Sequence, residues 1–125
     1  MPSHVTMEAA VHAYVRGFAT NDAVLISDLF AQNATIEDPL GTPAMAGGEE
    51  VRAFYARIMQ DGGARLELLG PVRTAAASAA FAFASFLTRE GVERRIDVID
   101  VWDFDEADKI ERMRAYWGPQ NVTDV

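Results

Sequence analysis

The chain has 125 residues, half of them hydrophobic and 24% charged, which is the balance of a globular protein that forms one domain over residues 1–125 and buries its own core. Its formal net charge of −8 argues against nucleic acid, an anionic membrane surface or an anionic substrate as a partner and favours a neutral small molecule. The absence of cysteine excludes disulfides, thiolate zinc sites and a cysteine nucleophile.

The N-terminal residues carry no targeting signal. Residues 1–6 lack a basic region followed by an apolar core, and no apolar run approaches the ~20 residues that cross a bilayer. We therefore expect a cytoplasmic protein without a membrane partner.

Helical spacing dominates the first half of the chain. Thr6 can cap a first helix, whose apolar stripe consists of Met7, Ala10, Val11, Tyr14, Val15 and Phe18. A second, short helix is predicted over residues 23–31. A third helix follows Gly47-Gly48 and ends at Asp61-Gly62-Gly63; its apolar stripe consists of Val51, Phe54, Tyr55 and Ile58.

The second half of the chain has the alternation of a sheet. A short strand at residues 34–38 and a loop at 39–48 precede the third helix, and turns are expected at 89–91 and 105–108. The later strands are predicted over residues 64–75, 78–88, 92–104 and 109–117. Helices followed by consecutive strands predict an α+β fold in which three N-terminal helices pack on a curved, largely antiparallel sheet.

Asp38 is the first candidate for chemistry, because it ends the strand 34–38 and precedes Pro39. Proline disfavours the helical region for the residue before it, so Asp38 should be extended and its carboxylate reproducibly aimed. The alternative interpretation is that Asp-Pro only begins a turn.

Asp100 is the second candidate, because alternation along residues 92–104 places it on the apolar face of the strand. Its companions on that face include Ile96, Val98, Trp102 and Phe104. One alternative is a satisfied buried acid that pairs with Arg94, Arg112 or Arg114. If no cation reaches the carboxyl, desolvation raises its pKa, and the protonated acid becomes a hydrogen-bond donor.

Three aromatic residues have two interpretations each. Tyr14 lies on the apolar stripe of the first helix, as a packed ring or as a phenol donor. Tyr55 could donate to Tyr14 or reach solvent. Trp117 alternates with Met113 and Ala115 on the last strand, and such a stripe forms either core or pocket.

Sequence motifs for metals and cofactors are absent. His4 and His12 are eight residues apart without the ligand spacing of a metal site, and no serine lies in a G-x-S-x-G context. The chain also contains no G-x-G-x-x-G or G-x-x-x-x-G-K-[ST] run. We therefore expect neither a metal nor a cofactor.

Several segments together resemble bacterial steroid Δ5-isomerase, also called ketosteroid isomerase, over nearly the whole chain. They are residues 12–15, 34–39, 54–55, 96–101 and the closing Arg114-Ala115-Tyr116-Trp117. The order of a tyrosine, an Asp-Pro pair and a strand aspartate is more specific than any one motif. The resemblance implies the cone-shaped α+β fold of nuclear transport factor 2 and a homodimer.

The resemblance also implies roles for the candidates. Asp38 would be the general base that moves a proton from carbon 4 to carbon 6 of a 3-oxo-Δ5-steroid. Tyr14 and protonated Asp100 would donate hydrogen bonds to the dienolate oxygen. Proton transfer within one substrate needs no cofactor.

The remaining site predictions concern the walls of the cavity. The residues predicted to contact the steroid are Tyr55, Phe83, Val98, Met113 and Trp117, and Trp117 is also expected to bond Asp38. Some members of the family carry another tyrosine where Phe30 stands, so only Tyr55 is left to support Tyr14.

Other functions fit the same fold, because a fold alone does not fix function. One alternative is another cofactor-free enzyme, such as an epoxide hydrolase or a polyketide cyclase. An epoxide hydrolase would require polar Asp-Arg-Asp activation of water, which the apolar setting of Asp100 does not favour. Another alternative is a non-catalytic protein that binds a steroid or another hydrophobic ligand.

Overall fold

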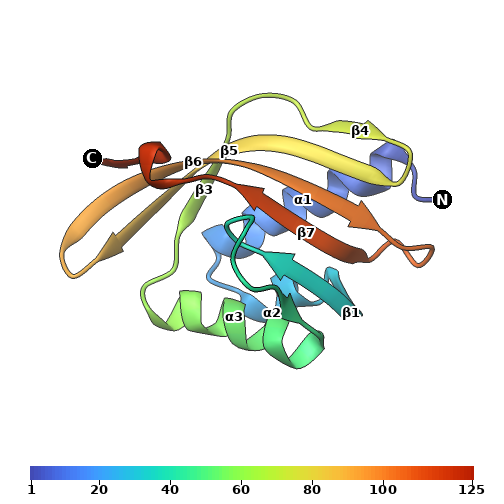
Figure 1. Cartoon of the computed structure of the whole chain (residues 1–125), viewed down its shortest axis with the longest axis horizontal. Helices are drawn as coiled ribbons and strands as arrows, with labels where there is room; N and C mark the ends of the chain where they lie inside the picture. The colour runs from blue at the N-terminus through green and yellow to red at the C-terminus, as the bar shows by residue number, and fades with distance from the viewer.

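The computed structural model describes residues 1–125 and has three helices and one curved, mixed sheet (Figure 1). The helices are α1 (His4–Ala19), α2 (Ala23–Ser27) and α3 (Gly48–Gln60). The strands are β1 (Phe30–Glu37), β2 (Met45–Ala46), β3 (Arg65–Leu68), β4 (Arg73–Ala75), β5 (Ser78–Arg89), β6 (Val92–Phe104), β7 (Ile110–Tyr116) and β8 (Val122–Asp124), with a 3₁₀ turn η1 (Pro119–Asn121). The predicted α+β class with three N-terminal helices is confirmed.

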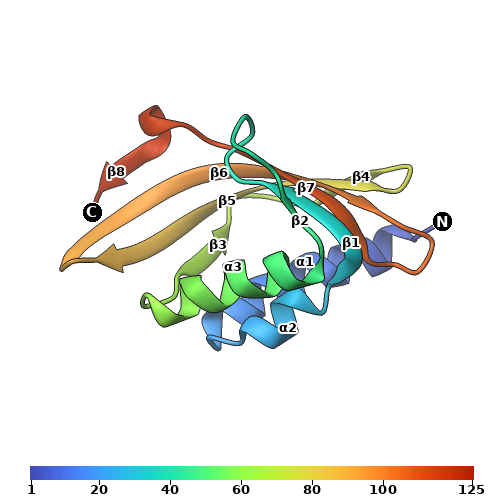
Figure 2. The same ribbon diagram turned by 60° about the horizontal axis from the view of Figure 1, so that its bottom comes forward.

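The sheet has the strand order β2-β1-β7-β6-β5-β3, while β4 pairs with β5 and β8 pairs with β6. Every pairing is antiparallel except that of β1 with β7, which is parallel. The sheet curves over the helices, which cover its concave face (Figure 2). None of the helices is both long enough and apolar enough to span a membrane.

A single apolar cluster of 22 buried residues joins the helices to the sheet. At Gly17, α1 approaches α2 so closely that a Cβ atom would lie 2.5 Å from Cγ1 of Ile26. This close approach keeps the short α2 against α1, and the chain then enters β1.

Three local predictions about the helices and β1 were wrong at their boundaries. Ser3, rather than Thr6, caps α1 by accepting a hydrogen bond from the Thr6 N–H. The second helix ends at Ser27 instead of residue 31, and β1 runs over Phe30–Glu37 instead of 34–38, because Phe30 already pairs with Ile110. Pairing with a distant strand therefore outweighs local helical spacing.

The predicted strand 64–75 is two strands, β3 and β4. Gly70 has a φ of 149°, and the following Pro71 has no N–H to donate, so the strand stops between Leu68 and Arg73. The predicted loop 39–48 contains β2, and β8 was not predicted at all. Both are short strands that exist only by pairing with β1 and β6.

Candidate active site

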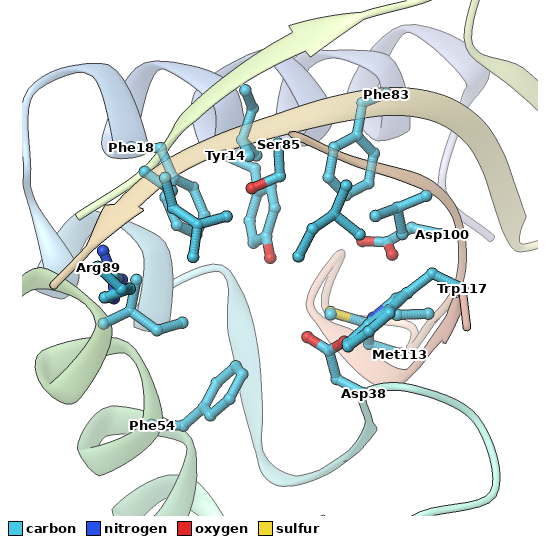
Figure 3. Close-up of a pocket in the computed structure, with 17 residues that line it drawn as sticks. Tyr14, Phe18, Asp38, Phe54, Phe83, Ser85, Arg89, Asp100, Met113 and Trp117 are labelled. Carbon is cyan, nitrogen blue, oxygen red and sulfur yellow. The ribbon is translucent and has the colours of Figure 1, made fainter. Parts of the chain in front are cut away.

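A cavity lies between the concave face of the sheet and the helices α1 and α3 (Figure 3). Thirteen of its 17 lining residues are hydrophobic. The predicted contact residues Phe83, Val98, Met113 and Trp117 all line it, together with Tyr14, Asp38 and Asp100. Its inner end is fully buried, and its outer end is formed by the partly exposed Phe54, Ile58, Leu87 and Arg89.

Asp38 and Trp117 meet because they follow the two parallel strands of the sheet. Asp38 comes directly after β1 and Trp117 directly after β7, so both lie at the C-terminal ends of these two parallel strands. The Trp117 indole N–H donates a 2.8 Å hydrogen bond to Oδ1 of Asp38. The backbone after Asp38 is held by a 2.8 Å bond from the Leu40 N–H to the carbonyl of Ala115.

The pKa of Asp38 is raised from its ordinary value because the carboxyl is partly removed from water. The Trp117 hydrogen bond acts in the opposite direction, since it stabilises the charged form. A carboxylate with one oxygen held and a moderately raised affinity for a proton is suited to general-base chemistry.

Asp100 lies in the middle of β6 with apolar neighbours on both sides. It is opposite Phe81 on β5 and Ala115 on β7, and none of its surface is exposed. The Trp102 indole N–H donates a 3.1 Å hydrogen bond to Oδ2 of Asp100. The other oxygen, Oδ1, has no hydrogen-bond partner.

The ion pair considered for Asp100 is not formed. Each of the three arginines considered as its partner binds a different carboxylate. These pairs are Arg94 with Asp124 at 3.1 Å, Arg112 with Glu37 at 3.3 Å and Arg114 with Asp103 at 3.0 Å.

Burial without a cation raises the pKa of Asp100 well above its ordinary value, and the nearby charge of Asp38 raises it further. The hydrogen bond from Trp102 opposes this shift without cancelling it. Burial therefore favours the neutral acid, in which one carboxyl oxygen can donate a hydrogen bond.

Tyr14 reaches the cavity from α1, and Tyr55 lies behind it. The two phenol oxygens are 2.9 Å apart, and Tyr55 is also 3.5 Å from Sδ of Met113. Tyr55 is completely buried and does not line the cavity, unlike the other four residues predicted to contact the ligand. The position of Tyr55 behind Tyr14 fits the prediction that Tyr55 supports Tyr14 by a hydrogen bond. Burial raises the pKa of both phenols well above the ordinary value, so both stay protonated.

Sequence reasoning assigned no role to two side chains of this region. Trp102 was correctly placed on the same face of its strand as Asp100, but the hydrogen bond between them was not inferred. The signal was their spacing, because residues two apart on a strand face the same side. Arg89 was assigned to a turn, although it continues the inward alternation of Phe83, Ser85 and Leu87 on β5. No three His, Asp or Glu side chains converge to hold a metal ion.

Comparisons with known proteins agree with this fold. The profile of the SnoaL-like domain family matches residues 11–113. A steroid Delta-isomerase of Nocardioides simplex is 35% identical to the chain over 118 residues, which cover 93% of each sequence. The structure of SalBIII, an epoxide hydrolase/cyclase-like enzyme with a role in pyran ring formation in the polyether salinomycin, has a TM-score of 0.92 and 25% identity over 100% of both chains. The predicted family resemblance and nuclear transport factor 2-like fold are confirmed.

The buried acid makes the stability of the fold depend on pH. Because folding raises the pKa of Asp100, the folded protein keeps a proton on this carboxyl up to a higher pH than the unfolded chain does. The free energy of unfolding should therefore fall by about 1.4 kcal/mol per pH unit above the unfolded pKa of about 3.9, until the folded pKa is reached. Asp100→Asn, a neutral isostere, removes this contribution, so we expect the variant to be more stable than wild type at about pH 7 and the difference to vanish near pH 4.

Urea unfolding of both proteins between about pH 4 and pH 8 measures this difference. Asp28→Asn, which removes an exposed carboxylate, is the control. A stability difference between Asp100→Asn and wild type that does not change with pH would mean that Asp100 is ionised in the folded protein.

Proposed function

The chain belongs to the SnoaL-like domain family, and on that premise we propose that it is a cofactor-free isomerase that moves the double bond of 3-oxo-Δ5-steroids to Δ4. The observation that carries the proposal is the pair of carboxyl groups in one apolar cavity, of which Asp100 is fully buried without a cation and has a raised pKa. The 35% identity to a protein named steroid Delta-isomerase supports the same reaction.

Asp38 acts as the base. Its Oδ1 is held by Trp117, which leaves Oδ2 to take the proton from carbon 4 of the steroid. The electron pair of that C–H bond moves into a dienolate whose negative charge lies on the C3 oxygen. Asp38 then returns the same proton to carbon 6, so the double bond becomes conjugated with the ketone and no atom is gained or lost.

Tyr14 and Asp100 stabilise the dienolate. Both are donors in a cavity with little water, where hydrogen bonds to a developing negative charge are strongest. For Tyr14 to donate to the ligand, Tyr55 must donate to Tyr14, which means that Tyr55 gives up its contact with Met113 when the ligand binds. The phenol pair then forms a relay that ends at the C3 oxygen.

The cavity suits an apolar ligand that it does not enclose completely. Its volume is about 150 Å³, whereas pockets for drug-sized ligands usually have about 300 Å³ or more. A steroid whose ketone lies at the buried inner end would therefore have its other end at the open outer end, near Phe54 and Arg89.

A second candidate is an epoxide hydrolase or a cyclase, including a polyketide cyclase, which is favoured by the structural similarity to SalBIII. Activation of water would need an arginine beside the acids. The nearest of the three arginines along the sheet, Arg114, is held by Asp103, and Asp38 is bound by a tryptophan. These contacts favour the isomerase. A ligand-binding protein without activity is the remaining alternative.

The reaction is tested by following the ultraviolet absorbance of the conjugated enone formed from 5-androstene-3,17-dione. We expect wild type to convert the steroid and Asp38→Asn to lose at least about 100-fold in kcat, because an amide cannot take up the proton. Glu37→Gln is the matched control, since it changes the adjacent carboxylate, which pairs with Arg112 outside the cavity. Binding of the steroid without conversion by wild type would favour a binding protein, and hydrolysis of an epoxide instead would favour the second candidate.

The convex face of the sheet supports a homodimer. Ile99 and Tyr116 are paired across β6 and β7 with 50% and 45% of their surface exposed, and the exposed Leu40 and Leu69 lie beside them along the same groove. An apolar patch of this kind on a small protein is typical of an interface. We propose that a second copy of the chain covers it.

Sedimentation velocity tests the dimer. We expect wild type to sediment as a dimer and Ile99→Lys as a monomer, because the substitution places an unpaired charge in the centre of the buried patch. Val24→Lys, a substitution at an exposed residue of α2, should leave the dimer intact. A monomeric wild type, or an unchanged Ile99→Lys, would exclude this interface.

A further inference from the structure

We propose that Trp102 is a positioning residue, which holds Oδ2 of Asp100 as an acceptor and so places the acidic proton on Oδ1, facing the cavity. The consequence for catalysis rests on the proposed function, whereas the placement of the proton does not. Nothing in the family resemblance or in the comparisons assigns a role to this tryptophan.

The contact is rigid and dry. Trp102 and Asp100 are two residues apart on the same face of β6, both have no exposed surface, and the hydrogen bond between them is 3.1 Å long. The indole is fixed edge-on by Tyr14 and Phe81, with ring centroids 5.0 Å and 4.9 Å away. The N–H therefore cannot turn to another partner.

The chemistry of a carboxylic acid then decides where the proton is. One oxygen of the acid carries the hydrogen and donates, while the other only accepts. An indole N–H is a donor only, and the carbonyl oxygen of an acid is a better acceptor than its hydroxyl oxygen, so this contact favours Oδ2 as the carbonyl and Oδ1 as the oxygen that carries the hydrogen. Oδ1 is the oxygen without a protein partner, and Asp100 lines the cavity, so the donor is left for the ligand.

The same tryptophan also positions the second donor. Its edge-on contact with the Tyr14 ring keeps the phenol on the same side of the cavity as Asp100 (Figure 3). Without the indole N–H, either oxygen of Asp100 could carry the proton, and only part of the molecules would present a donor to the C3 oxygen.

Infrared spectroscopy of Trp102→Phe tests the placement. The C=O stretch of protonated Asp100 is identified as the band that Asp100→Asn removes. Loss of the hydrogen bond to Oδ2 should shift this band to higher frequency. The kcat of isomerisation should fall about tenfold, while KM stays within about twofold, because one hydrogen bond acts on the transition state.

The control is Phe104→Leu. It disturbs the packing of Trp102, whose ring centroid is 6.1 Å away, and keeps the indole N–H. We expect the C=O band of this variant to stay in place. An unmoved band in Trp102→Phe, or an equal shift in both variants, would overturn the proposal.

A second replacement protects the test against misfolding. Benzothienylalanine at position 102 has the shape of tryptophan with sulfur in place of the N–H, and it should shift the band like phenylalanine. The infrared result does not need turnover, so it distinguishes failure of this proposal from failure of the proposed function.

An independent observation at the outer end of the cavity concerns Arg89, and we infer that this residue binds a carboxylate at the end of a steroid side chain. Its Nη1 donates to the carbonyls of Gly63 at 3.1 Å and Thr88 at 2.9 Å, which fix the guanidinium. Nε and Nη2 make no hydrogen bond to the protein, and no carboxylate lies within 4.0 Å. Nε and Nη2 together can donate two parallel hydrogen bonds to the two oxygens of one carboxylate.

The position of Arg89 indicates which end of the ligand it would meet. Arg89 is eight residues beyond Phe81 on β5, and Phe81 is opposite Asp100, so Arg89 and Asp100 lie at opposite ends of the cavity. A steroid whose ketone is held at Asp100 would direct its side chain toward Arg89. The net charge of −8 does not prevent binding of the acidic end, because exposed charges farther than about 8 Å are largely screened at physiological ionic strength.

Calorimetry with 3-oxo-5β-cholan-24-oic acid and its methyl ester tests Arg89 without turnover. We expect wild type to bind the acid more tightly than the ester, and Arg89→Met to lose about tenfold in affinity for the acid alone. Arg89→Lys keeps the positive charge but cannot make two parallel hydrogen bonds to a carboxylate. Its affinity for the acid should therefore lie between the affinities of wild type and Arg89→Met. Equal affinity of wild type for acid and ester, or an equal loss for both ligands in Arg89→Met, would overturn the inference.

Discussion

The removal of Asp100 from water without a counter-ion is the constraint on which the site depends. A buried carboxyl ionises when a cation is adjacent, and the sheet carries Arg94, Arg112 and Arg114 as possible ion-pair partners of Asp100. Each of them is bound to an acid on the outside of the protein, as Arg114 is to Asp103. The pKa of Asp100 is therefore raised, and burial favours the protonated acid, which can donate a hydrogen bond from a strand interior that would ordinarily be only core.

The two carboxyl groups of the cavity differ because the topology places them differently. Asp100 lies in the middle of β6, where both neighbouring strands cover it. Asp38 lies at the end of β1, partly exposed, and meets Trp117 only because β1 and β7 run parallel in an otherwise antiparallel sheet. The charge of Asp38 further raises the pKa of Asp100, so an ionised Asp38 favours a protonated Asp100.

The sequence predicted those features that follow from a local period. Alternation in β6 correctly placed Asp100 on the apolar face, and helical spacing correctly placed Tyr14 on the buried stripe of α1. The sequence did not predict the parallel β1–β7 pairing, because the partners of a strand are decided by contacts over long distances in the chain. The partner of Arg114 and the position of Tyr55 behind Tyr14 depend on the register of those pairings, which no local pattern contains.

Burial, rather than hydrogen bonding, distinguishes the two carboxyl groups. Each carboxyl accepts one indole N–H, from Trp117 at Asp38 and from Trp102 at Asp100, and each bond favours the ionised form. The pKa of the fully buried Asp100 is nevertheless raised well above its ordinary value, because desolvation outweighs the bond from Trp102. Arg114 is paired with Val101, so it lies on the face of the sheet opposite to Asp100, and there it binds Asp103. Alternation along β7 therefore keeps this cation out of the cavity, although it is only one residue from Ala115, which is opposite Asp100.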